Sequence, residues 1–123
     1  MTTASGQSSH TEGQSTKSIG VYSHAEGFYV TANSKSQHVQ GEYNILDTEN
    51  VSERSTYAHI VGNGTGTSAR SNAHTLDWSG NAWFAGDVYV GSTSGINKDE
   101  GSKKLATIDD ITAAIGNAIA ASY

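Results

Sequence analysis

Five histidines are the side chains of this sequence best able to do chemistry: His10, His24, His38, His59 and His74. Glu12 and Glu26 each follow a histidine by two positions. An imidazole beside a carboxylate can form an ion pair, move a proton or ligate a metal such as zinc. Residues i and i+2 of a β-strand face the same side, so each histidine is expected to lie beside its glutamate.

A strict repeat positions these side chains. His-Thr-Glu-Gly at 10–13 recurs as His-Ala-Glu-Gly at 24–27 and as His-Val-Gln-Gly at 38–41, with steps of 14 residues (24 − 10 and 38 − 24). A fixed period indicates stacked, similar units, and this one is too short for a pair of helices. It suits two short strands and two tight turns. The glycine that ends each copy is expected to need a positive φ: Gly13, Gly27 and Gly41.

The repeat predicts an all-β fold in which each strand pairs with the same strand one repeat along, as in a β-solenoid. Its core positions hold mostly Ser, Thr, Ala, His and Glu. One thin coil of this composition cannot bury enough apolar surface to fold alone. We therefore expect several chains to pack together.

The repeat resembles the head repeats of YadA-type trimeric adhesins, and still more the variant of those repeats in tail fibres of bacteriophages and prophages. The resemblance covers roughly residues 2–44, and the third copy departs from it at Gln37, Val39 and Gln40. It implies a trimeric, left-handed parallel β-roll and a role in attachment or fibre building. The segment 72–88 resembles one common in phage tail and minor structural proteins of Gram-positive gut bacteria, which favours a phage fibre over a bacterial adhesin.

The region 1–74 is expected to form the repeat unit, with an outward, polar loop inserted at 45–56. After the loop, His59 and Gly62 restore the His-x-x-Gly spacing, 21 residues (59 − 38) beyond the third copy. The glycine-rich run at 62–66 is a turn signal and lacks the lysine of a phosphate-binding loop.

An aromatic β-module is expected over 75–91. Its core, shared between chains, is expected to hold Trp78, Trp83 and Phe84. Asp77 and Asp87 near these aromatic residues are compatible with a carbohydrate site, but turn residues beside core aromatics are the favoured interpretation.

A polar linker over 92–106 is expected to lead into a trimerising helix over 107–123. Thr107 can cap this helix, and Asp110 can close a capping box. Apolar residues then follow a heptad spacing and form the expected helix seam: Ile108, Ile111, Ile115 and Ala118. Isoleucine at both core positions of a heptad favours a coiled coil of three or more strands.

Composition limits the function classes. A net charge of −5 without a basic patch argues against nucleic acid as a partner, and no apolar run is long enough for membrane insertion. The absence of Cys fits cytosolic assembly.

Three interpretations of the histidines remain open: a ladder of His–Glu and His–Ser hydrogen bonds, an inward column of His10, His24 and His38 that binds a metal or an anion, or plain solvent exposure. We favour the ladder and expect no metal and no cofactor. Ser23 and His24 are not a catalytic dyad, because neighbours on a strand point apart. We expect no catalytic residues and no enzyme activity.

The sequence thus predicts a structural and adhesive segment of a homotrimeric phage tail fibre. Its expected partners are two further copies of the chain, other tail components and a host-surface glycan or protein. Its expected location is the virion, after assembly in the host cytoplasm. The alternatives are the head fragment of a bacterial trimeric autotransporter adhesin, on the bacterial surface, and a fibre-borne glycan hydrolase.

Overall fold

A computed structural model of the chain describes residues 1–48, 50–91 and 103–122. These residues divide into two compact units, Met1–Ala85 and Gly86–Tyr123. The first unit contains the repeats and all five histidines. The second contains a short hairpin and the helix.

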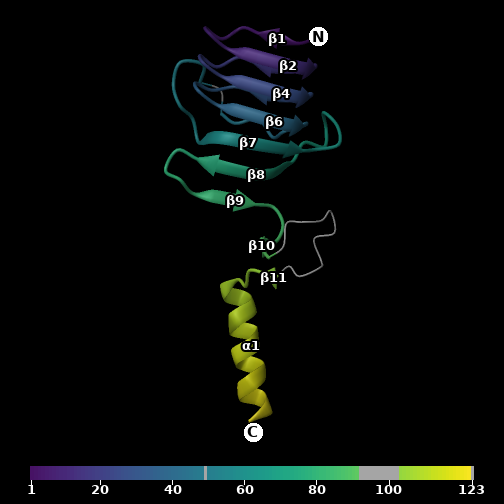
Figure 1. The fold of residues 1–123 in the computed structure, drawn as a ribbon, viewed down its shortest axis with the longest axis vertical. Helices are drawn as coiled ribbons and strands as arrows, with labels where there is room; N and C mark the ends of the chain where they lie inside the picture. Colours follow the sequence, from purple (N-terminus) through teal and green to yellow (C-terminus); the bar gives the residue numbers. More distant parts are fainter. Residues whose placement is uncertain (49, 92–102, 123) are drawn as a thin grey trace. The chain divides into compact units, whose positions relative to one another are not determined.

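The repeats form a stack of parallel strands in the first unit (Figure 1). Four strands form one wall of the stack: β2 (His10–Gln14), β4 (His24–Phe28), β6 (His38–Glu42) and β7 (Tyr57–Asn63). Three two-residue strands form a second, smaller sheet: β1 (Thr3–Ala4), β3 (Lys17–Ser18) and β5 (Thr31–Ala32). His10 pairs with His24, and His24 with His38. The 14-residue step is therefore the register of the sheet, as the sequence predicts.

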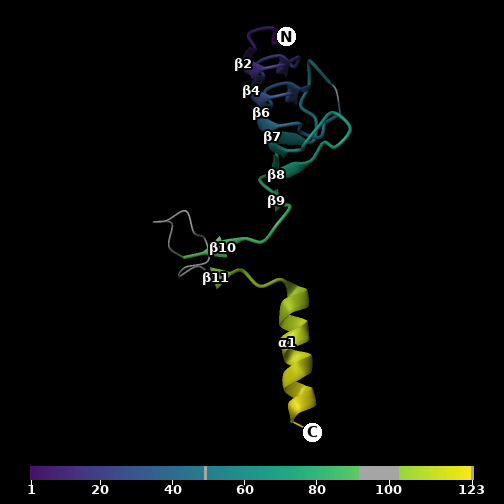
Figure 2. The same ribbon diagram turned by 90° about the vertical axis from the view of Figure 1, so that its right-hand side faces the viewer.

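The expected fold class, an all-β, left-handed parallel β-roll or solenoid with a short C-terminal helix, is wrong, because the strands do not close into a solenoid. The expected helix is present. The structure is of mixed α/β class: the first unit holds two sheets, one of them mixed, and the second unit contains a helix. β8 (Asn72–Asp77) runs antiparallel to β7, and β9 (Ala82–Phe84) runs antiparallel to β8. The parallel repeats thus end in an antiparallel hairpin and do not close into a solenoid. The strand arrows show this reversal in Figure 1, and Figure 2 shows β8 and β9 beyond β7 at the end of the stack.

The chain reverses because residues 63–71 form a tight, hydrogen-bonded connection. The Asn63 N–H donates to the Ser71 carbonyl, and the Thr65 N–H donates to the Ala69 carbonyl, each at 3.0 Å. This connection returns the chain beside the strand that it has just left, so β8 pairs antiparallel with β7. The turn signal at 62–66 is real, and its effect is to end the parallel stack.

The interior of the first unit is narrow and partly polar. Its buried apolar side chains are Ala25, Val30, Ala32, Val39 and Ile60. Small polar side chains fill the remaining space and bond to backbone groups: the Ser23 hydroxyl donates to the Gly20 carbonyl at 2.7 Å, and the Asn44 amide donates to the Thr31 carbonyl at 3.1 Å. Buried polar groups need such partners, and this requirement explains the Ser- and Asn-rich repeat.

The glycine that ends each histidine motif has the expected positive φ. Gly27 has a φ of 123°, and a Cβ built on it would lie 2.1 Å from the carbonyl oxygen of Gly41 in the next repeat. Only a residue without Cβ fits both the dihedral angle and the close approach. The strands can therefore stack in register only with glycine at this position.

The segment 45–56 differs from the expected outward loop. Its first part lies against the third repeat: the Asn33 amide donates to the Asp47 carbonyl at 3.0 Å, and the Ser34 hydroxyl donates to the Thr48 carbonyl at 2.8 Å. Both bonds join residues 14 positions apart. The repeat register therefore continues into this segment, and the additional residues follow Thr48.

The expected boundary between 74 and 75 falls within β8, and the expected linker over 92–106 lies largely outside the described residues. In the second unit, β10 (Tyr89–Val90) pairs antiparallel with β11 (Lys103–Lys104). The helix α1 spans Ile108–Ala121, with the predicted capping box between Thr107 and Asp110. Among the helices of the described residues, none is long and apolar enough to cross a membrane.

Candidate functional site: a ladder of histidine and glutamate

The five histidines form one continuous ladder across the six-stranded sheet. Consecutive ring centroids from His10 to His24, His38, His59 and His74 are separated by 4.8, 4.9, 5.0 and 5.8 Å. The last step crosses from a parallel to an antiparallel strand, so the ladder outlasts the repeat. We call this set of five residues the histidine ladder.

The histidine ladder lies on the face of the sheet that points away from the interior. Ala25, Val39 and Ile60 each follow a ladder histidine directly, and all three are fully buried. Because side chains alternate across a strand, the preceding histidines face the opposite side. His24, His38 and His59 are accordingly only half-buried. The alternative interpretation of an inward column of His10, His24 and His38 is thus not met within one chain, because these histidines stack outside its core.

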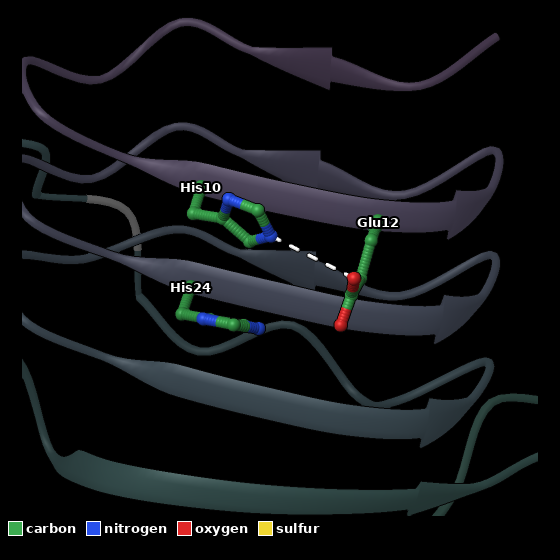
Figure 3. Close-up of side chains that lie close together, drawn as sticks. All are labelled: His10, Glu12 and His24. Atoms are coloured by element: carbon green, nitrogen blue, oxygen red, sulfur yellow. Dashed lines mark ion pairs between the residues drawn. The ribbon is translucent and has the colours of Figure 1, made fainter.

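Glutamates stand beside the first two rungs of the histidine ladder. Glu12 Oε2 lies 3.8 Å from His10 Nε2 on the same strand, and Figure 3 shows its carboxylate reaching toward the level of His24 on the next strand. Glu26 lies between two imidazoles, with Oε2 3.5 Å from His24 Nε2 and Oε1 3.4 Å from His38 Nε2. The carboxylates end there, because Gln40 and Val61 occupy the corresponding positions on β6 and β7.

The electrostatics of the histidine ladder favour an ionised Glu26 carboxylate and a neutral His59 imidazole. Burial raises the pKa of Glu26, but hydrogen bonds with Glu12 and His38 and the charges of His38 and His24 outweigh burial, so this pKa lies below its usual value. Burial lowers the pKa of His59, and the adjacent His38 and His74 lower it further.

Two buried nitrogens of the histidine ladder have no hydrogen-bond partner among the described residues: His24 Nε2 and His59 Nε2. His24 Nε2 faces Glu26 at 3.5 Å without the geometry of a hydrogen bond. Among the His–Glu pairs, only His38 and Glu26 meet that geometry, at a long 3.4 Å. Adjacent rungs thus touch mainly through their rings, and the expected hydrogen-bond ladder is sparse within one chain.

The expected core aromatics lie outside the core of the single chain. Trp83 is 50% and Phe84 is 54% exposed on β9. Phe84 stacks on His74, with centroids 4.4 Å apart and planes 22° from parallel, and so extends the histidine ladder. Trp78 is half-buried, with the Arg54 guanidinium 4.2 Å above its ring. A core shared between chains stays a prediction.

Asp47 is an organising residue that the sequence did not single out. Its carboxylate accepts hydrogen bonds from the Gln37 side chain, the Ser55 hydroxyl and the Tyr57 N–H, at 3.0, 2.6 and 3.0 Å. These hydrogen bonds hold the end of the inserted segment and the start of β7, the strand that carries His59, beside Asp47. A polar residue in a charged run gives no local signal of this role.

No protein-family model matches the chain, and no curated protein and no solved structure matches it either.

Proposed function

We propose that this chain is a structural and adhesive segment of a homotrimeric phage tail fibre that attaches to a host surface. The observation that carries the proposal is an exposed apolar stripe on α1. Its isoleucines are 82, 51, 56 and 52% exposed: Ile108, Ile111, Ile115 and Ile119. The described residues of this helix include none that is buried.

An amphipathic helix with an uncovered stripe favours association, because burying an isoleucine side chain contributes about 1.5–3 kcal/mol. Successive isoleucines of the stripe are 3, 4 and 4 residues apart. Ile119 therefore takes the fourth position of the seam, for which the sequence pattern predicted Ala118. Isoleucine at both seam positions of a coiled coil favours trimers or tetramers over dimers. Three copies of this chain are the occupants that this stripe fits best.

The first unit supports the same proposal. Its six-stranded sheet ends in β9, where Trp83 is 50% and Phe84 is 54% exposed. The buried apolar core of this unit has only five residues. So small a core leaves little to stabilise an isolated unit, and contact with neighbouring chains would bury the aromatic rings. The resemblance of the His-Ala-Glu-Gly repeat and of the segment 72–88 to phage fibre proteins supports the role in attachment.

Two measurements test the proposal. Multi-angle light scattering of the purified chain should give about three times the chain mass of 12.9 kDa. A folded monomer at micromolar concentration would contradict the trimer. Fluorescently labelled chain should also bind intact cells in a panel of Gram-positive and Gram-negative bacteria. Release of sugars from those cells would instead support a glycan hydrolase, and absence of binding across the panel would contradict the adhesive role.

A further inference from the structure

We propose that His24, Glu26 and His38 form a binding site for one divalent transition-metal ion, of the class that zinc represents. All three side chains are half-buried on adjacent strands, β4 and β6, and lie on one face of the sheet. Each offers one ligand atom, and these atoms lie within 4.8 Å of one another. All three residues belong to one chain, so this metal site does not depend on the proposed trimer.

The spacing of these atoms suits a shared metal better than direct contact. Ion-paired N–H and carboxylate groups approach to about 2.7–2.9 Å when they bond directly. Here His24 Nε2 and His38 Nε2 lie 3.5 and 3.4 Å from the Glu26 oxygens. Ligands at about 2.0–2.1 Å from a tetrahedral zinc are separated from each other by about 3.3 Å. Each imidazole nitrogen thus lies at about the separation of two tetrahedral ligands from one Glu26 oxygen, Oε2 for His24 and Oε1 for His38.

The chemistry of the three side chains supports the same assignment. Two imidazoles and one carboxylate are a common ligand set for zinc, and they leave one coordination position for water. Imidazole also suits copper and nickel. His24 Nε2 has no hydrogen-bond partner in the described structure, so its lone pair or proton is not engaged elsewhere. A glutamate carboxylate is ionised at neutral pH, as a metal ligand must be.

A second group of the same type overlaps the first. His10, Glu12 and His24 also lie within 4.8 Å of one another, and Figure 3 shows the three side chains converging from β2 and β4. This group is more open, because His10 and Glu12 are exposed and 3.8 Å apart. Both groups need His24, and one imidazole nitrogen binds one metal. The two groups therefore exclude each other, and we expect one ion per chain.

Isothermal titration of the full chain with ZnCl₂ tests the site. One zinc should bind per chain, and His24→Gln should abolish binding because it removes the shared ligand. Glu26→Gln and His38→Gln should each weaken binding by at least 10- to 100-fold, the loss typical even of outer-shell changes around metals. Two strong ions per chain, or unchanged binding by His24→Gln, would overturn the proposal.

Two matched controls separate this site from others on the same face. His59→Gln removes the imidazole that stacks on His38 at 5.0 Å, where no carboxylate is adjacent, and should leave zinc affinity within about twofold. His10→Gln should do the same. A loss of zinc binding with His10→Gln but not with His38→Gln would place the ion in the group of His10, Glu12 and His24 and would contradict the assignment.

A spectroscopic measurement keeps the test independent of stability. In proton–nitrogen NMR spectra, zinc should shift the ring signals of His24 and His38 and leave those of His74 in place. Far-UV circular dichroism should show that His24→Gln retains the fold without metal, since this side chain is not part of the core. Equal shifts of all five ring signals would indicate unspecific surface binding and would overturn the site.

Discussion

The side-chain amide of Gln37 donates to the carboxylate of Asp47 across 3.0 Å, and this bond joins the third repeat to the segment that follows it. Gln37 is fully buried, and its amide also donates to the Tyr57 carbonyl at 3.0 Å. One carboxylate therefore fixes both the end of the third repeat and the start of β7.

Asp47→Ala should lower the free energy of unfolding by about 1–3 kcal/mol, because buried donors that lose an acceptor remain unsatisfied. Urea unfolding followed by circular dichroism measures the change. Glu53→Ala is the matched control: it removes the same charge from an exposed position of the same segment and should change stability by less than about 0.5 kcal/mol. Equal effects of the two variants would show that Asp47 does not organise the segment.

Gly27→Ala should destabilise the first unit severely. A Cβ at this position would lie 2.1 Å from the Gly41 carbonyl oxygen, on a backbone with a φ of 123°. Backbone strain of this kind costs about 1–3 kcal/mol, and overpacking adds about 1–3 kcal/mol. Thermal melts should show the loss, whereas Gly66→Ala, with no atom within 4 Å of its Cβ, should melt close to the parent protein. A Gly27→Ala protein of unchanged stability would contradict the in-register stacking.

Acid should weaken the β8–β9 hairpin through Asp77. The Asn81 side chain, followed by the backbone N–H groups of Asn81, Ser79 and Gly80, holds the pKa of this carboxyl below its usual value. The unfolded pKa is about 3.9, so the stabilisation is complete above that pH and is lost as pH falls through the lower folded pKa. Asp77→Asn should abolish this part of the acid dependence of thermal melts between about pH 2 and 5, since the amide does not titrate there. Asp87→Asn is the control, and an identical change in both would exclude the turn as the cause.

Ile115→Asp should dissociate the trimer into single chains, because a charge in the isoleucine stripe cannot be buried without a partner. Asn117→Asp adds the same charge about 200° around the helix from Ile115, on the opposite face, and should leave the trimer intact. Light scattering of both variants at one concentration decides between them. Dissociation by both variants would point to a general loss of helix. A trimer that stays intact with both variants would show that the stripe is not the interface.

The sequence by itself determined the features that depend on local or periodic signals. Copies of His24 recur every 14 residues, and identical units gain most when they stack in register, so strand pairing followed from the spacing alone. Gly27 and the Thr107–Asp110 capping box were also predictable, because dihedral limits and helix caps involve only neighbouring residues or the next repeat.

Only the tertiary structure decided the features that depend on distant partners. The sequence predicted a turn after Gly62. It did not predict that this turn would reverse the chain and make the sheet mixed. Burial of Trp83 could not be inferred from its hydrophobicity, because burial requires a second surface and the single chain provides only part of one. The placement of Glu26 between His24 and His38 likewise required the sheet, since the atoms meet only when adjacent strands bring them to one face.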